Sequence, residues 1–158
     1  MRGTVQIQHT YEVGTEWQGN RGTGTSDYRS YGREVLLTAP GKPDILGSAD
    51  RAFRGNVERW NPEDMLLAAL SECHLLSYLH VAASHGIVVT EYTDSATGIM
   101  EQTADGGGFF VSVTLRPVVT ISSGDPELAH SLHEEAGAKC FIAASVNFPV
   151  FHEPTLRT

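Results

Sequence analysis

The chain has few cysteines: only Cys73 and Cys140 occur among its 158 residues. This number excludes a disulfide-rich scaffold, a four-cysteine zinc site and a cysteine-ligated iron–sulfur cluster. The two cysteines are also too far apart in the chain to form a CxxC motif. In a reducing compartment, such a pair either belongs to the packed interior or carries redox chemistry.

Basic residues are scarce as well. Lys and Arg total 11, against 19 Asp and Glu, so the formal net charge is -8. Nucleic acids and anionic membranes are bound through a basic face, so neither is expected as a partner. The chain starts without an apolar signal segment, and the apolar stretch 65–83 is interrupted by Glu72, His74 and His80. We therefore expect one domain over residues 1–158, located in the cytoplasm.

Hydrophobic periodicity predicts an α+β fold with the element order β-β-α-β-β-α-β and adjacent antiparallel strands. The expected strands cover residues 5–13, 33–38, 87–102, 109–121 and 146–151. Pro149 suits the last of them to a sheet edge. Residues 41–60 are expected to form a long loop, and loops of this length are often functional.

Two long helices are expected, and each carries one cysteine. The first covers residues 62–85 and directs Cys73 toward the apolar interior. The second follows a capping Asp125 and covers residues 126–144, which places Cys140 inside it. If the helices pack together, the two sulfur atoms come within disulfide range. The alternative is that both cysteines are small buried apolar groups.

The start of the first helix carries a family signature. Residues 61–73 read Asn-Pro-Glu-Asp-Met-Leu-Leu-Ala-Ala-Leu-Ser-Glu-Cys. This segment resembles the N-P-E-x-L…A-x-x-x-C signature of the OsmC/Ohr superfamily, the osmotically inducible and organic hydroperoxide resistance proteins. The position of Cys140 and the element order agree with that family along nearly the whole chain. The resemblance implies an OsmC-like fold with antiparallel sheets and two long central helices that carry the cysteines, in an intertwined homodimer.

The resemblance also implies a function. The peroxidases of this family reduce organic hydroperoxides in peroxide stress defence without a metal, flavin or other cofactor. Cys73 would then attack the peroxide and become a sulfenic acid, and Cys140 would condense with it to a disulfide. A dithiol reductant, a lipoyl-bearing protein in one branch, would reopen the disulfide.

An arginine completes the site implied by the resemblance. Glu63 matches the family glutamate that holds an arginine beside the reactive sulfur, where its charge lowers the thiol pKa. The Arg-Phe-x-Gly segment of the family reads Ala-Phe-Arg-Gly here, so Arg54 is the first candidate and Arg51 the second. Arg29 and Arg33 are candidates from the N-terminal strands.

The helix geometry and the neighbours of the cysteines add two expectations. Glu63 lies ten residues before Cys73, about 15 Å along the helix axis, so each site is expected to draw on both subunits. Cys73 is followed by His74 instead of Phe, and Cys140 by Phe141 instead of Pro. These departures from the family pattern indicate a divergent branch.

Two other functions stay open. A non-catalytic family member would bind a small apolar ligand in the same pocket. A metal-binding protein would use His130, His133 and His74 together with Cys140. The histidines lack a further ligand at a predictable spacing, and histidines on helix surfaces are usually solvated, so no metal is expected.

Overall fold

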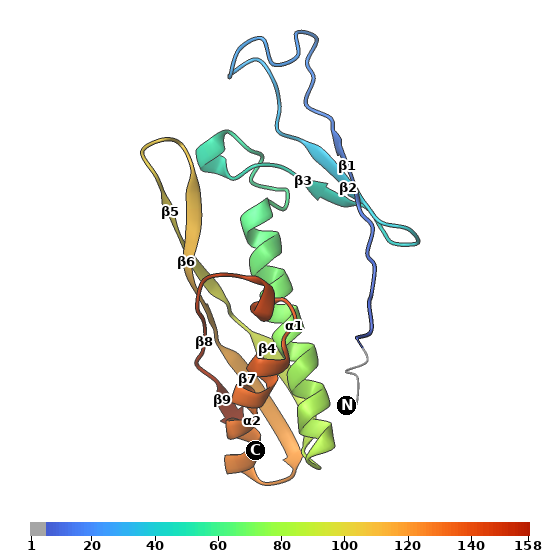
Figure 1. Ribbon diagram of the computed structural model, residues 1–158, viewed down its shortest axis with the longest axis vertical. Coiled ribbons are helices and arrows are strands. Elements are labelled where there is room, and N and C mark those ends of the chain that lie inside the picture. The colour runs from blue at the N-terminus through green and yellow to red at the C-terminus, as the bar shows by residue number, and fades with distance from the viewer. Residues whose placement is uncertain (1–5) are drawn as a thin grey trace. The chain divides into compact units, whose positions relative to one another are not determined.

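The chain divides into two compact units, Met1–Asp64 and Met65–Thr158. The computed structural model describes residues 6–158 (Figure 1). The N-terminal unit is built on one small sheet. The C-terminal unit contains the second long helix, all but the first turn of the first, both cysteines and two further sheets.

The N-terminal sheet has three antiparallel strands in the order β1-β2-β3. They are β1 (Gly14–Trp17), β2 (Val35–Thr38) and β3 (Ile45–Gly47). The strand expected at 33–38 is thus confirmed as β2. The expected loop 41–60 contains β3 and a short 3-10 turn, Arg51–Phe53.

The strand expected at 5–13 is wrong over the part that the structure describes. Residue 5 lies outside the described residues, and residues 6–13 are exposed and form no strand there. The strand begins at Gly14, directly after the end of the expected range, because residues 14–17 pair with Thr38 to Val35. Alternation of apolar and polar residues favours an extended backbone, but a strand also needs a hydrogen-bonding neighbour.

The C-terminal unit has two three-stranded sheets, in the orders β4-β7-β9 and β5-β6-β8. The strands are β4 (Val88–Asp94), β5 (Thr97–Gln102), β6 (Gly108–Leu115), β7 (Pro117–Ser123), β8 (Val150–His152) and β9 (Thr155–Arg157). Each of the two long strands expected at 87–102 and 109–121 is therefore divided into two. The β5–β6 and β4–β7 pairs are antiparallel, as expected for adjacent strands.

The expectation of purely antiparallel sheets is wrong. β8 pairs with β6, and β9 with β7, and both pairs are parallel. The helix after β7 returns the chain over the sheet, and a strand that follows such a crossover runs parallel to the strand before it. The strand expected at 146–151 is present only as β8, at a sheet edge as Pro149 indicated.

The first long helix, α1 (Pro62–Ser84), forms as expected. The side chain of Asn61 caps it by accepting a hydrogen bond from the Asp64 N–H at 2.8 Å. Gly86, with φ 74°, lies in the left-handed region just after its end. Local signals therefore determine both ends of the helix that carries Cys73.

The second long helix, α2 (Pro126–Lys139), is shorter than expected. Asp125 caps it by accepting a hydrogen bond from the Glu127 N–H at 3.0 Å. Cys140 has an extended backbone, with ψ 111°, and is the C-cap residue rather than an interior one. A separate 3-10 turn, η2 (Ala143–Ser145), follows. The alanine-rich sequence continues through this break, so periodicity alone did not reveal it.

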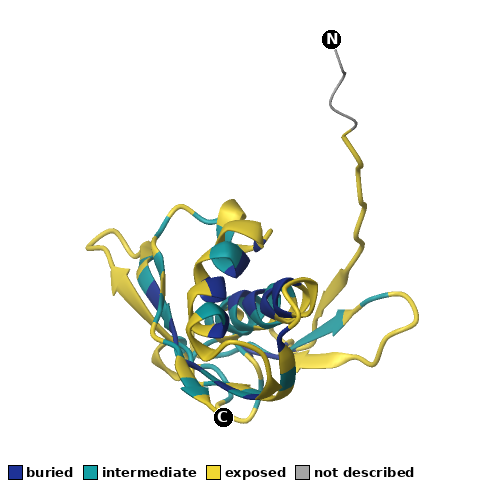
Figure 2. Ribbon diagram, turned by 90° about the horizontal axis from the view of Figure 1, so that it is seen from below, coloured by how far each residue is buried: buried dark blue, intermediate teal, exposed yellow. Residues whose placement is uncertain are grey.

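The core of the C-terminal unit lies where the two helices pack on the sheets, as the buried residues in Figure 2 show. It comprises Tyr78, Val81 and Ala82 of α1, Ala129, Leu132 and Ala136 of α2, and Ile87, Val119 and Ile121 beside them. Among residues 6–158, α1 is the one helix long and apolar enough to cross a membrane. Five of its residues, Leu70, His74, Tyr78, Val81 and Ala82, are buried.

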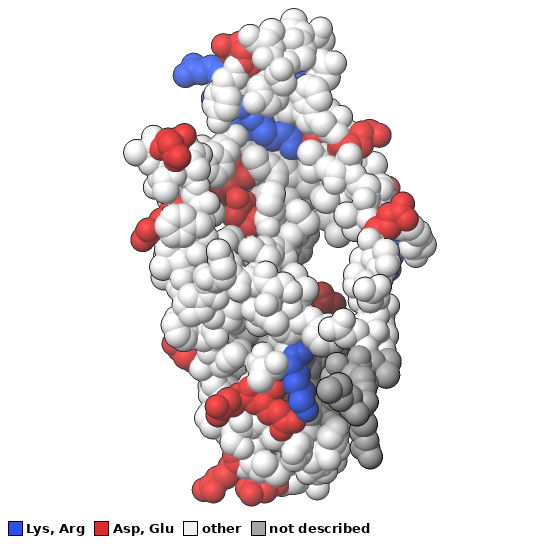
Figure 3. Space-filling view, in the orientation of Figure 1, with Lys and Arg blue, Asp and Glu red and all other residues white. Residues whose placement is uncertain are grey.

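The charge on the surface agrees with the composition. On the face drawn in Figure 3, the described basic side chains are few and form no continuous patch, whereas acidic side chains are spread widely. A basic surface for polyanion binding is therefore absent from this face of the described residues.

Candidate functional site

The structure brings the two cysteines together. Cys73 lies on α1 and is partly exposed, whereas Cys140 follows α2 and is 2 % exposed. Both thiols are free. The two thiols are close enough to affect each other's ionisation, because the Cys73 side chain is among the causes that raise the pKa of Cys140. The expectation that the two sulfur atoms lie within disulfide range stays a prediction.

The two thiols have different surroundings. Burial first, and then the hydrogen bond with Cys73, raises the pKa of the Cys140 thiol to about 11. The Ala143 N–H, which donates to Cys140 Sγ at 3.4 Å, partly opposes this shift. At pH 7 the Cys140 thiol is then almost entirely protonated. Cys140 is therefore poorly suited to open a reaction, and the more accessible Cys73 is the better placed first nucleophile.

Three histidines and a tyrosine form a stacked cluster in the core of the same unit. His74 on α1 and His133 on α2 are hydrogen-bonded, with 3.1 Å between Nε2 of His74 and Nδ1 of His133. The His152 ring stacks on His74 at 4.2 Å between ring centroids, and the Tyr78 ring stacks on His133 at 4.0 Å. We refer to His74, His133, His152 and Tyr78 as the imidazole cluster. His152 was not singled out from the sequence, because its proximity depends on the pairing of β8 with β6.

The imidazole cluster is neutral at physiological pH. Burial is the main cause that lowers the pKa of His74 to about 4 and that of His133 to about 3, and charge repulsion within the cluster adds to it. Burial also lowers the pKa of His152. Within residues 6–158, no three His, Cys, Asp or Glu side chains converge as metal ligands. The possible metal ligands named from the sequence, His74, His130, His133 and Cys140, therefore do not form a metal site in the described residues.

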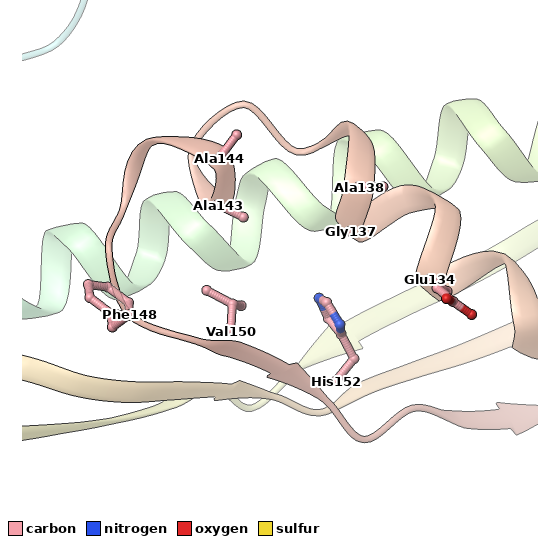
Figure 4. Close-up of a pocket in the computed structure, with 8 residues that line it drawn as sticks. All are labelled: Glu134, Gly137, Ala138, Ala143, Ala144, Phe148, Val150 and His152. Atoms are coloured by element: carbon pink, nitrogen blue, oxygen red, sulfur yellow. The ribbon is translucent and has the colours of Figure 1, made fainter.

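A cavity of about 420 Å³ lies beside this cluster (Figure 4). It is lined by Glu134, Gly137 and Ala138 of α2, Ala143 and Ala144 of η2, and Phe148, Val150 and His152 around β8. Its wall is mostly apolar, with His152 and Glu134 as the polar side chains. Ala143 connects the cavity to Cys140, because its N–H donates to Cys140 Sγ. The space is open to solvent, and its mostly apolar wall offers contacts to a small apolar molecule.

Gly137 allows the close contact of α2 with His152. A Cβ placed on Gly137 would lie 2.8 Å from Cε1 of His152, a ring already held by stacking on His74. A Gly→Ala change inside a helix normally stabilises by up to about 1 kcal/mol. We expect Gly137→Ala instead to lower the free energy of unfolding by about 1–2 kcal/mol, since overpacking outweighs helix propensity here. Urea denaturation measures the change, and the exposed Ala138→Gly variant calibrates propensity alone. A stabilised Gly137→Ala protein would contradict the contact.

The other predicted site residues belong to the N-terminal unit. Glu63 is in the first turn of α1, and its Oε2 is buried with no hydrogen-bond partner among the described residues. Arg54 is exposed and has φ 65° at the end of the 3-10 turn that contains Arg51. Their relation to the thiols stays a prediction. Arg29 is exposed, so its side chain is also accessible.

Arg33, the fourth arginine candidate, is engaged within its own unit. Its guanidinium donates hydrogen bonds to the carbonyl oxygens of Tyr31 and Tyr28, at 2.5 and 2.7 Å. It also lies over both tyrosine rings, at 3.9 and 4.5 Å from their centroids. These contacts hold the side chain in the loop before β2, so Arg33 is the least available of the four in the described structure.

Comparison with known proteins gives the family. A model of the family described as OsmC-like protein matches residues 55–154. The protein YmaD of Bacillus subtilis (strain 168) is 25 % identical over 142 residues, which cover 87 % of each chain. An OsmC-like protein of unknown function from Vibrio cholerae, VCA0330, is 29 % identical with a TM-score of 0.84, over 93 % of this chain and 99 % of that one.

The fold also extends to proteins whose names state an activity. The organic hydroperoxide resistance protein OhrB of Bacillus subtilis has a TM-score of 0.61 and 20 % identity, over 94 % of this chain and 98 % of that one. At this identity the likeness shows the fold alone. The family model, however, covers more than half of the chain, together with both cysteines. The protein therefore belongs to the OsmC-like protein family.

Proposed function

We propose that this protein is a thiol peroxidase that reduces organic hydroperoxides. The observation that carries the proposal is the proximity of a partly exposed thiol, Cys73, to a buried thiol, Cys140, whose pKa it helps to raise. Such a pair can pass through one complete oxidation without a metal or an organic cofactor. The name of OhrB, a protein of the same fold, supports hydroperoxides as the substrate class.

The cycle has three steps. The Cys73 thiolate attacks the peroxide, which breaks the O–O bond, releases an alcohol and leaves a sulfenic acid. The Cys140 sulfur then displaces the hydroxyl group, which leaves as water with the thiol proton, and a disulfide forms. An external dithiol, such as a lipoyl-bearing protein, finally reduces the disulfide and is itself oxidised. The protein acts in this proposal in the cytoplasm, where reductants of this kind are present.

The activating arginine comes from a second subunit in this proposal. Glu63 has a buried carboxylate oxygen with no hydrogen-bond partner in the described chain, and a buried carboxylate is costly unless it is paired. A guanidinium satisfies such an oxygen well, and Arg54 is the first candidate for it. The exposed apolar side chains of residues 6–13, among them Ile7, Tyr11 and Val13, support association of two copies as a homodimer.

The test of the function is a titration of the thiols of the full-length protein with cumene hydroperoxide. We expect one equivalent to consume both thiols and to lower the intact mass by two hydrogen atoms, because a Cys73–Cys140 disulfide forms. Peptide mapping identifies the linkage, and dithiothreitol should restore both thiols. The control is the protein blocked beforehand with an alkylating agent. Thiols that persist under excess hydroperoxide would refute the peroxidase proposal.

The cavity favours a second candidate function. Its volume of about 420 Å³ and its apolar wall suit a small apolar ligand, which a non-catalytic family member would bind. In that case both cysteines stay reduced in the titration above. Replacing either cysteine by serine would then leave ligand binding largely unchanged.

A further inference from the structure

The two helices that carry the thiols are also joined by a buried hydrogen bond. His74 of α1 and His133 of α2 are only 1 % and 4 % exposed, and their ring nitrogens lie 3.1 Å apart. His74 directly follows Cys73 in the chain, and His133 lies two helical turns before Cys140. The bond therefore connects the two chain segments that carry the thiols.

Imidazoles are a costly choice for this interior position. Nδ1 of His74 is buried and has no hydrogen-bond partner among residues 6–158. Two apolar rings of similar shape would avoid this desolvation cost. The imidazoles add a directional contact, because their hydrogen bond forms in only one register of α2 against α1. Apolar contacts alone would tolerate sliding of one helix along the other.

The neighbouring contacts hold the same register. Tyr78 of α1 stacks on His133, and its hydroxyl donates to the Ala129 carbonyl oxygen at 2.7 Å. From the other side, His152 stacks on His74 and lies against Gly137, one turn before Cys140. The C-terminal half of α2 is thus fixed at several points just before its chain reaches Cys140.

We propose that His74 and His133 are positioning residues for disulfide formation, since their hydrogen bond holds α2 in the register that places Cys140 for reaction with Cys73. This role rests on the proposed function, in which Cys140 displaces the hydroxyl group of the Cys73 sulfenic acid. The bonds that change are S–O and S–S, and the thiol proton leaves in water. The histidines exchange no proton in this step. They hold the two helices in a fixed relative position before the S–S bond forms.

The test separates the hydrogen bond from the ring. In the full-length protein, His74→Phe and His133→Phe keep an aromatic ring and remove the bond. His74→Gln and His133→Asn place an amide nitrogen close to the bonded ring nitrogen and preserve a bond. The exposed His80 of α1 and His130 of α2, each changed to Phe, are the matched controls.

The measurement is the equilibrium between the dithiol and the Cys73–Cys140 disulfide in buffers of oxidised and reduced dithiothreitol, after oxidation with diamide. We expect both Phe variants at the buried positions to lower the equilibrium constant about two- to tenfold, the range of one net hydrogen bond. The amide variants should stay within about twofold of wild type, and so should the two controls. The double Phe variant should resemble either single variant, because both remove the same bond.

Circular dichroism confirms that each variant is folded. Folded Phe variants with an unchanged equilibrium constant would overturn the proposal. If the Phe variants do not fold, the amide variants test the proposal. An equilibrium constant for disulfide formation that falls more than tenfold in folded His133→Asn protein would overturn the proposal. Failure of the peroxidase function gives a different result, because hydroperoxide then leaves the thiols intact. Diamide still forms the disulfide, so the effect of the His74–His133 bond on the equilibrium constant is still measured.

Discussion

Cys73→Ser is expected to reduce turnover of cumene hydroperoxide at least about a hundredfold, because a serine hydroxyl is not ionised near pH 7 and no other thiol replaces it. Cys140 does not substitute for Cys73, since its thiol is buried and has a pKa raised to about 11. The rate is measured by peroxide consumption with dihydrolipoamide as the reductant. Turnover retained in Cys73→Ser protein would show that the peroxide is not reduced at this sulfur.

Cys140→Ser should fail at a different step. The first oxidation of Cys73 proceeds, but the sulfenic acid has no thiol partner in the same site and is trapped by dimedone. One equivalent of peroxide is therefore consumed rapidly, and further turnover with the dithiol is slow. The control is Ser77→Ala on α1, the helix of Cys73, which removes a hydroxyl and leaves both thiols. A Cys140→Ser protein with full turnover would remove the resolving role from Cys140.

The free energy of unfolding should fall steeply as the pH is lowered from 7 to 5. The folded protein holds the pKa of His74 at about 4 and that of His133 at about 3, below the unfolded value of 6.5. Neutral imidazole is thus favoured in the fold, so this stability is complete above pH 6.5 and is lost as the pH falls toward the folded values. The two histidines together are expected to account for about 3–4 kcal/mol of that loss.

Urea denaturation at a series of pH values measures this effect. The His74→Phe/His133→Phe double variant has neither buried imidazole, so its stability should depend less on pH over the same interval. His80→Gln, at an exposed position of α1, should keep the wild-type dependence. Wild-type stability that stays constant from pH 7 to 5 would contradict the buried neutral cluster. Carboxylates that titrate at lower pH affect the wild type and the double variant alike.

Both cysteines could be identified from the sequence, but not all of their surroundings. The Asn61 cap and Gly86 determine the ends of α1, and both act within one helical turn, so local sequence signals predicted this helix correctly. The residues after α2 were harder to predict. An alanine-rich pattern continues past Lys139, whereas Cys140 has an extended backbone and its Sγ accepts a hydrogen bond from the Ala143 N–H.

Sequence by itself determined the α+β class, the cysteine-bearing helix α1 and the family signature around Asn61, because capping, periodicity and motif spacing are local properties. Only the tertiary structure decided that β8 and β9 run parallel to their partners, and that His152 reaches His74 across 78 positions of the chain. Such contacts depend on how the crossover through α2 returns the chain to the sheet. No local pattern encodes that return, so the imidazole cluster beside the thiols became visible only in the folded chain.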